Sequence, residues 1–140
     1  MLFPKKTKFR KWQVHRKHVS KLQLPDTRGT TVAFGSYGLK ATSQARITSN
    51  QIEAARRAAN REAGKGAKMW IRVFPDRPVT AKAAEVGMGK GKGDPKGFVM
   101  DIRPGRILFE IDGVSETVAR AALRKAGMKL PVTVKVVERA

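Results

Sequence analysis

The sequence contains no cysteine, so disulfide bonds and thiolate metal sites are excluded. Acidic residues are scarce, with 11 against 30 lysines and arginines, and the 140 residues carry a formal net charge of +19. Like charges on this scale repel one another in a compact chain, so we expect a polyanionic partner. No apolar run is long enough to span a membrane, and the first residues lack the apolar core of a secretory signal. Nucleic acid is therefore the first candidate partner and an anionic membrane surface the second. The basic N-terminal segment lacks the clean apolar face that a membrane-surface helix needs, so no membrane partner is expected, and the cytoplasm is the expected location.

Residues in arrangements that support catalysis are also scarce. The two histidines, His15 and His18, lie in a basic segment without further metal ligands nearby, and no carboxylates are paired at metal-binding spacing. An ordinary turn role is expected for the four aspartates that flank turn residues, Asp76, Asp94, Asp101 and Asp112. We expect no catalytic residue, metal, cofactor or small-molecule substrate. An enzyme acting on nucleic acid stays open as the alternative class.

A glycine occurs at every second position of the run GMGKGKG at residues 87–93. Glycine lets backbone N–H groups approach a surface closely, and the lysines add cations, so the run favours contact with phosphate oxygens. A flexible linker is the alternative, although linkers more often combine glycine with serine. A P-loop is excluded because neither lysine precedes serine or threonine, and the dinucleotide fingerprint lacks its third glycine.

Residues 1–27 are predicted to form a basic N-terminal arm. No acid precedes Asp26, and Phe3, Phe9 and Trp12 are interleaved with the cations. A run of like charges is usually a solvated tail, but interleaved aromatic rings suit RNA, because cations neutralise phosphates while rings stack on bases. We expect an extended arm that becomes ordered on its partner.

Residues 28–140 are predicted to form a single α+β domain, with two main helices on a mostly antiparallel sheet. A capping box from Thr48 or from Asn50 starts the first helix, which ends at Gly64. Ser115 caps the second helix, which ends at Gly127. Strands are expected at residues 30–39, 68–74, 98–102, 106–111 and 132–137, the third and fourth of which should form a hairpin. No strand is expected within the long loop at residues 75–97.

The first helix presents arginines opposite its narrow apolar stripe. On a period of 3.6 residues, Arg57 and Arg61 lie on the opposite face and Arg56 lies on the flank. Solvated arginines on a surface helix are the alternative. In so basic a chain we favour phosphate contact, because the planar guanidinium group grips phosphate oxygens in pairs.

Six ordered blocks of sequence together resemble a known family. The blocks are KKTKFRK at 5–11, FGSYGLK at 34–40, QIEAARR at 51–57, WIRVFPD at 70–76, MGKGKG at 88–93 and PGRILFE at 104–110. In this order they are similar to ribosomal protein sixteen of the large subunit, bacterial type, whose archaeal and eukaryotic relatives are numbered ten. The resemblance covers nearly the whole chain.

The resemblance implies an α/β-hammerhead fold without catalytic residues. It also implies binding to large-subunit (23S-type) rRNA beside the central protuberance, close to the aminoacyl-tRNA site and the peptidyl-transferase centre, among neighbouring ribosomal proteins. Together with the charge of the arm and of the first helix, it predicts rRNA contacts at Lys5, Lys6, Lys8, Arg10, Lys11, Arg16, Lys17, Arg56, Arg57 and Arg61. The loop expected to face tRNA in the aminoacyl site comprises Met88, Gly89, Lys90, Gly91, Lys92 and Gly93.

The chain departs from the family pattern at three places. Gly87 occupies the position before the loop where many bacterial members carry an arginine, so one cation facing RNA is missing. Residues 96–99 read KGFV where the family usually has Glu-Tyr-Trp-Val. Residues 13–27 also differ from the usual basic segment rich in glycine and arginine.

Overall fold

The computed structural model describes residues 2–13, 23–89 and 91–140, and the structural statements below concern these residues. The helices are α2 (Ser49–Ala63) and α3 (Glu116–Gly127). The strands are β1 (Tyr37–Ala41), β2 (Ala45–Thr48), β3 (Lys68–Ile71), β4 (Arg77–Ala81), β5 (Asp94–Ile102), β6 (Ile107–Asp112) and β7 (Val134–Glu138). None of the helices in these ranges has the length and apolar character needed to cross a membrane.

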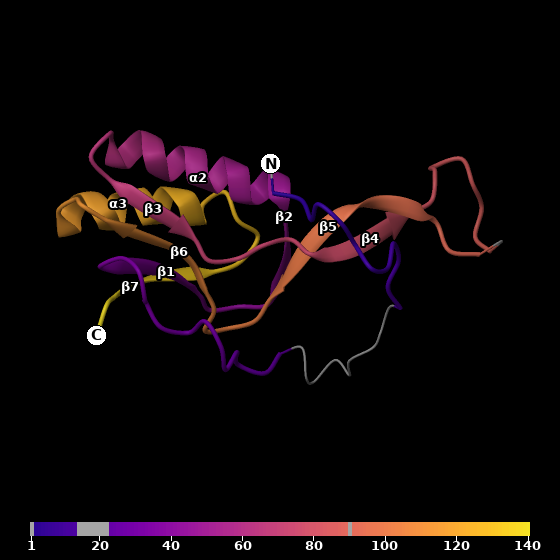
Figure 1. Ribbon diagram of the computed structural model, residues 1–140, viewed down its shortest axis with the longest axis horizontal. Coiled ribbons are helices and arrows are strands. Elements are labelled where there is room, and N and C mark those ends of the chain that lie inside the picture. Colours follow the sequence, from indigo (N-terminus) through magenta and orange to yellow (C-terminus); the bar gives the residue numbers. More distant parts are fainter. Residues whose placement is uncertain (1, 14–22, 90) are drawn as a thin grey trace.

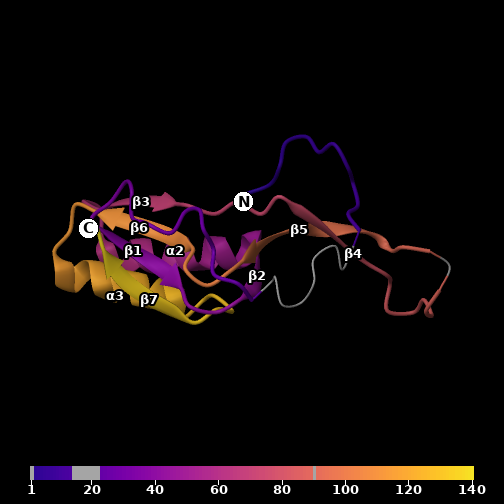
Figure 2. The same ribbon diagram turned by 90° about the horizontal axis from the view of Figure 1, so that it is seen from below.

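The strands form two antiparallel sheets. One has the order β3-β6-β1-β7 and carries α2 and α3 side by side on one face (Figure 1). We call this sheet with its two helices the body. The other sheet has the order β2-β5-β4, and its strands β4 and β5 extend away from the body as a two-stranded ribbon (Figures 1 and 2). The structure confirms a single α+β domain with two helices, but it has two sheets where one was expected.

The core lies between the two helices and the inner face of the body sheet. Helix α2 contributes Ile52, Ala55 and Ala59, as the predicted stripe requires. The other fully buried side chains packed there include Leu39, Phe109, Ile111, Ala119, Ala122 and Leu123. Small alanines on both helices let them pack closely, and Lys125 of α3 reaches Glu62 of α2 at 2.6 Å.

Both helix starts follow the predicted capping chemistry. Of the two candidate boxes, the structure selects the one at Thr48, whose hydroxyl accepts from the Gln51 amide at 3.3 Å. The Gln51 side chain in return accepts from the Thr48 amide at 3.0 Å. Helix α3 begins after Ser115, whose hydroxyl accepts from the Val118 amide.

Two predicted strand arrangements are wrong. Residues 30–36 are not a strand, because successive backbone N–H groups there converge on the carboxylate of Glu110 instead of a neighbouring strand. The expected hairpin of the third and fourth strands also fails, because β5 and β6 belong to different sheets. Gly105, at a φ of 97°, turns the chain there, and its amide donates to Ala41. The turn between β5 and β6 therefore connects the two sheets.

The long loop predicted at residues 75–97 is also shorter than expected, because β4 occupies its first part and the start of β5 its last part. Pro78 hides β4 from sequence patterns, yet proline is tolerated because β4 is an edge strand of its sheet. Pro95 and Gly97 likewise make the first half of β5 hard to recognise from sequence patterns. The register of the β4–β5 pairing shifts opposite them, between Val79 and Thr80. The loop proper, which we call the tip loop, comprises residues 82–93.

Candidate nucleic-acid interface

The basic arm lies across the molecule from the body to the ribbon (Figures 1 and 2). Leu2 packs against the core cluster at one end. At the other end Trp12 lies against the ribbon, with the guanidinium of Arg77 6.0 Å from the centre of its ring. The backbone carbonyl of Trp12 accepts a hydrogen bond from the ammonium of Lys92. Residues 2–13 of the arm are therefore held at two points, and the cations of this described part lie between them.

The described cations of the arm are all exposed: Lys5, Lys6, Lys8, Arg10 and Lys11. Phe3 and Phe9 are also half or more exposed, and the ammonium of Lys8 lies 5.5 Å from the centre of the Phe9 ring. Cations beside open rings fit the predicted combination of phosphate neutralisation and stacking. The predicted contacts Arg16 and Lys17 lie outside the described residues.

The base of the ribbon contains an ion-paired cluster that the sequence did not reveal. Asp101, in β5, accepts from Arg46 of β2 at 3.1 Å and from Arg77 of β4. One carboxylate thus connects all three strands of its sheet, so the turn role expected for Asp101 is wrong. Strand β2 has only four residues, which is too short an alternation to recognise, and its pairing with β5 joins residues far apart in sequence.

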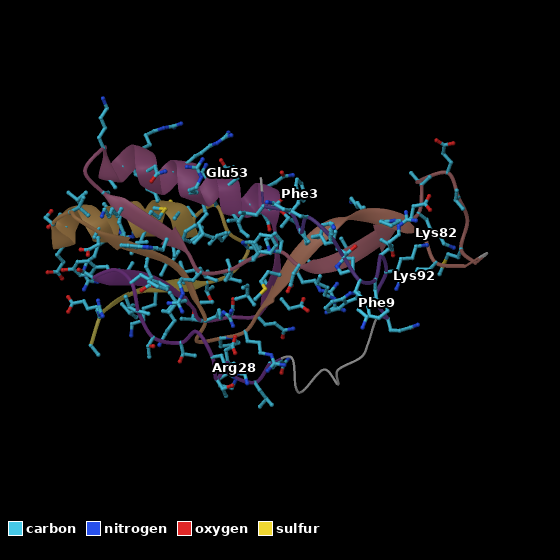
Figure 3. All side chains as sticks on the ribbon, in the orientation of Figure 1. Phe3, Phe9, Arg28, Glu53, Lys82 and Lys92 are labelled. Carbon is cyan, nitrogen blue, oxygen red and sulfur yellow. The ribbon has the colours of Figure 1, made fainter. Side chains whose placement is uncertain are left out.

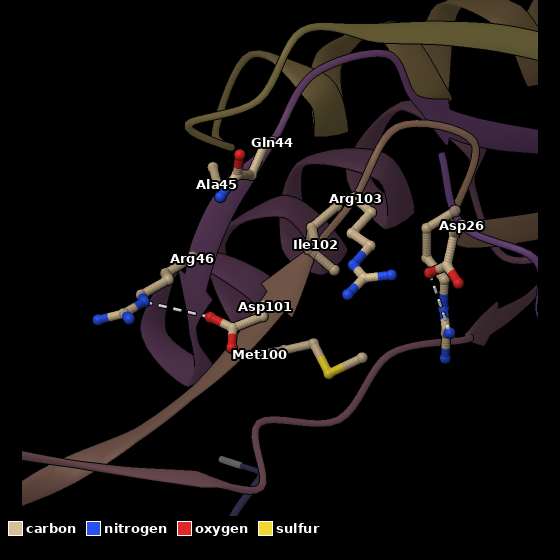
Figure 4. Close-up of a pocket in the computed structure, with 9 residues that line it drawn as sticks. Asp26, Gln44, Ala45, Arg46, Met100, Asp101, Ile102 and Arg103 are labelled. Carbon is tan, nitrogen blue, oxygen red and sulfur yellow. Dashed lines mark hydrogen bonds and ion pairs between the residues drawn. The ribbon is translucent and has the colours of Figure 1, made fainter. Parts of the chain in front are cut away.

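A basic hollow of about 310 Å³ lies where the ribbon joins the body (Figure 4). Three arginines line it, Arg46, Arg103 and Arg106, against two acids. The acids are already engaged, since Asp101 binds Arg46 at 3.1 Å and Asp26 accepts from Arg106 at 3.4 Å. In the described part of the chain Arg103 makes no ion pair, and Nε of Arg106 is buried without a hydrogen-bond partner. The hollow therefore has cationic donors in excess and suits an anionic oxygen.

The tip loop is the part of the described chain farthest from the core (Figure 1). Met88 is fully exposed, and Gly89 and Gly91 adopt positive φ values of 97° and 88°. Gly93 lets the backbone of the loop approach the backbone of Ala81, because a Cβ at this position would lie 2.7 Å from the carbonyl carbon of Ala81. The predicted glycine run therefore has a structural basis at these three positions. Lys90 lies outside the described residues.

Two lysines stand where the tip loop meets the strands (Figure 3). The ammonium of Lys82 donates to the carbonyl of Gly89 and bridges the loop. The ammonium of Lys92 donates to Trp12, as described above. Sequence reasoning singled out Lys92 but missed Lys82, which the pattern of the glycine run does not include. Both ammonium groups have partners on the chain, and both remain exposed at the surface.

Two of the three arginines of helix α2, Arg56 and Arg57, are arranged around one acid. Glu53 accepts from Nε of Arg56 at 3.0 Å, from Nη2 of the same side chain, and from Nε of Arg57 at 3.3 Å. The hydrogen bond from Arg56, and the charges of both arginines, lower the pKa of Glu53 to about 2. The same hydrogen bond raises the pKa of Arg56. Arg57 and Arg61 are exposed and Arg56 is half-buried, as expected for their helical positions.

The predicted contact residues thus fall into two groups. The Lys92–Trp12 hydrogen bond joins the arm to the tip loop, and Arg77 joins Trp12 to the ribbon base. The arginines of α2 lie apart from these on the body, where Figure 3 shows Glu53 well removed from Lys82 and Lys92. Within the described ranges, no group of three or more potential ligands is placed to hold a metal ion.

Comparison with known proteins assigns the family. The model for ribosomal protein L16p/L10e matches residues 4–137. Large ribosomal subunit protein uL16 of Halorhodospira halophila is 57% identical over 139 residues, covering 99% of this chain and 98% of the relative. The uL16 protein of Leptospira biflexa is 54% identical with the same coverage, and uL16c of Zygnema circumcarinatum is 52% identical over 94% of this chain and 90% of the relative. The chain belongs to the ribosomal protein L16p/L10e family.

Proposed function

We propose that this chain is a structural constituent of the large ribosomal subunit and binds its 23S-type rRNA. The observation that carries the proposal is the family match over residues 4–137, whose relatives are named as proteins of that subunit. The physical properties agree, because a chain of charge +19 with exposed cations in its arm favours a polyanionic partner. Membership in a family of structural ribosomal proteins confirms the prediction that the chain is not an enzyme.

The rRNA contacts are proposed at two separate surfaces. One comprises the arm cations, with Arg16 and Lys17 included from the sequence, and continues through Trp12 to the basic hollow. The other comprises Arg56, Arg57 and Arg61 on α2. Glu53 holds the guanidinium groups of Arg56 and Arg57 in place, so less conformational entropy is lost when they meet phosphate. Both surfaces would act mainly through phosphate and shape, as RNA recognition often does.

The finer placement follows the family resemblance. The chain would lie beside the central protuberance, in contact with neighbouring ribosomal proteins of a cytoplasmic ribosome, and would help to organise the aminoacyl-tRNA site next to the peptidyl-transferase centre. The run 88–93 would contact tRNA there. The ribbon carries the exposed tip loop away from the core, as Figure 1 shows. This supports the role, because such a loop can reach a ligand beyond the body. The α/β-hammerhead assignment, and the division into an arm at 1–27 and a domain at 28–140, belong to the same proposal.

The proposed function is tested by sedimenting the tagged protein from cell lysate through a sucrose gradient, before and after a high-salt wash. We expect stoichiometric comigration with the large subunit before the wash, and a lower retained fraction after it. The cationic contacts should be released as salt rises, because phosphate neutralisation makes log affinity fall by roughly 0.7–0.9 per neutralised phosphate for each log unit of salt. Protein found only at the top of the gradient would contradict the proposal. It would favour the alternative, an RNA-binding protein that acts outside the ribosome.

A further inference from the structure

A partly exposed aromatic pair lies on the body, apart from the contacts proposed above, with Phe34 exposed and Trp70 half-buried. Phe34 precedes β1, and 55% of its surface is exposed. Its ring stacks on Trp70 of β3, with 6.2 Å between ring centres and 22° between ring planes. The guanidinium of Arg72 lies 5.1 Å from the centre of the same ring. An aromatic pair and a cation therefore share one site at the edge strand of the body sheet.

Polar interactions hold this exposed ring in position. The buried carboxylate of Glu110 accepts from the amides of Ala33 at 2.6 Å, Phe34 at 3.0 Å and Gly35 at 3.4 Å. Its other oxygen accepts from Arg72 at 2.7 Å. A charge fully removed from water is expensive unless it is paired and hydrogen-bonded, and here it fixes both the backbone of Phe34 and the cation beside it. The sequence block FGSYGLK thus holds the ring of Phe34 in a fixed position at the surface, where it does not pack in the core.

The edge strand continues the same chemistry along its length. Trp70 is paired with Glu110 in the ladder between β3 and β6, so it faces the outer side of the sheet. Lys68 and Arg72, two residues before and after it, share that side because side chains alternate along a strand. Phe74 follows with 41% of its surface exposed, whereas Val73 beside it is buried. Cations and rings thus alternate along β3 and the residues that follow it, and cations combined with stacking rings are typical of surfaces that bind single-stranded RNA.

We propose that Phe34 and Trp70, flanked by Lys68 and Arg72, form a stacking site for an unpaired nucleobase of rRNA. This inference rests on the proposed function and adds a third contact, in which the protein stacks on a base in addition to binding phosphate. A base inside a duplex has both faces covered by its neighbours, so the occupant comes from a loop, bulge or end. Two carboxylates lie near the flanking cations: Glu110, which is buried and engaged by Arg72, and Asp112, which is paired with Lys68 across the ladder. The exposed ring of Phe34 and the net charge of +19 of the whole chain therefore favour nucleic acid over a protein neighbour.

The experiment uses Trp70 as its own reporter. Trp12→Phe leaves Trp70 as the single tryptophan of the chain, and Trp70→Phe leaves Trp12 as the matched control. On titration with deproteinised large-subunit rRNA, we expect the emission of Trp70 to be quenched by the stacked base. Phe34→Leu should abolish most of that quenching and weaken binding about tenfold, the lower part of the range for loss of one stacked base. The salt dependence should stay unchanged, because no cation is removed.

Phe34→Tyr keeps the ring and should bind like the parent chain, and thermal melting establishes whether Phe34→Leu remains folded. If Phe34→Leu does not fold, the quenching of Trp70 in the Trp12→Phe chain decides alone. Salt-dependent binding with unaltered Trp70 emission would overturn the stacking site and leave the proposed function standing. Quenching seen only in complete subunits, and not with rRNA, would assign the site to a protein neighbour and overturn the inference. Absence of salt-dependent binding would overturn the proposed function itself.

Discussion

The body and the ribbon are stabilised in different ways. In the body, Leu39, Phe109 and Leu123 are completely removed from solvent between the sheet and two helices. The ribbon joins this core only at its base, where Ile47 and Ile102 are buried, and every residue from 81 to 89 is exposed. Apolar burial therefore holds the body, whereas backbone pairing and the bonds of Asp101 to two arginines hold the ribbon.

This difference indicates which part depends on a partner. Apolar burial contributes about 25 cal/mol per Å² whether or not a ligand is present, so the body can persist alone. Exposed ion pairs contribute about 0–1 kcal/mol each, and an exposed cation gains more from phosphate than from water. We therefore expect the ribbon to have the lower local stability and to gain most from rRNA. The predictions that follow test this comparison.

The largest effect is expected in the body, from Glu110→Gln. The substitution replaces a buried carboxylate that accepts from three amides and from Arg72, and an amide group cannot satisfy all of these donors. Breaking a buried pair costs about 3–5 kcal/mol, which should lower the midpoint of thermal unfolding by roughly 10 °C. Glu138→Gln removes an exposed partner of Arg120 and is the matched control, with a cost below about 1 kcal/mol. Equal melting temperatures for the two variants would contradict the role given to Glu110.

A smaller effect on stability, but a clear one on binding, is expected in the ribbon from Asp101→Asn. It releases Arg46 and Arg77 from their shared carboxylate, so that the half-exposed Arg46 can pair with phosphate, whereas Arg77 is largely buried and loses its partner. We expect a loss of about 1–3 kcal/mol in stability, below that of Glu110→Gln, together with tighter rRNA binding through Arg46. The salt dependence should steepen by roughly 0.7–0.9 for each additional phosphate contacted.

Asp94→Asn is the matched control for this change. It lies in the same strand and alters the net charge equally, and Asp94 has no arginine partner among the described residues. If the two variants bind rRNA with the same salt dependence, the ion-paired cluster at the ribbon base does not restrain its arginines. Hydrogen exchange should also show faster opening of the ribbon amides in Asp101→Asn, with the amides of β6 unaffected.

The same contrast explains how much the sequence could predict. In the body, the capping box at Thr48, the stripe of Ile52, Ala55 and Ala59, and the cap at Ser115 are local signals, and the structure confirms each of them. Local signals identify helices because capping and periodicity act within a few residues. The glycine run was likewise readable, and so was the exposure of residues 87–89, 91 and 92, since Met88 is the run's one apolar side chain.

Contacts between distant residues could not be read in this way. Glu110 engages the amide of Phe34 across 76 positions, and Asp101 meets Arg46 across 55, so neither shows in a local pattern. Pro78 made β4 resemble a break, because only the place of a strand at a sheet edge determines whether a proline is tolerated. The arm could be predicted as basic and aromatic, but the contact of Trp12 with Lys92 depends on the ribbon that brings them together.

The smallest effect is expected from the helix that presents arginines in the body, and it depends on pH. The pKa of Glu53 lies at about 2 in the folded chain, against 4.5 as its ordinary value, chiefly because Arg56 donates to its carboxylate. A lowered pKa means that the folded state binds this proton less readily than the unfolded state does. The stabilisation is therefore complete above about pH 4.5 and is lost as the pH falls towards 2.

Thermal melting of the parent chain and of Glu53→Gln from pH 6 to pH 2 measures this contribution. The difference in melting temperature between them should shrink on acidification and become small at the lower limit, since Glu53 is then almost wholly protonated in the unfolded state and about half protonated in the folded state. Glu85→Gln removes an exposed carboxyl of the tip loop and should follow the parent at every pH. If Glu85→Gln showed the same pH-dependent difference as Glu53→Gln, loss of net negative charge would explain both. The ordering of Arg56 and Arg57 by Glu53 would then contribute nothing to the stability of the body.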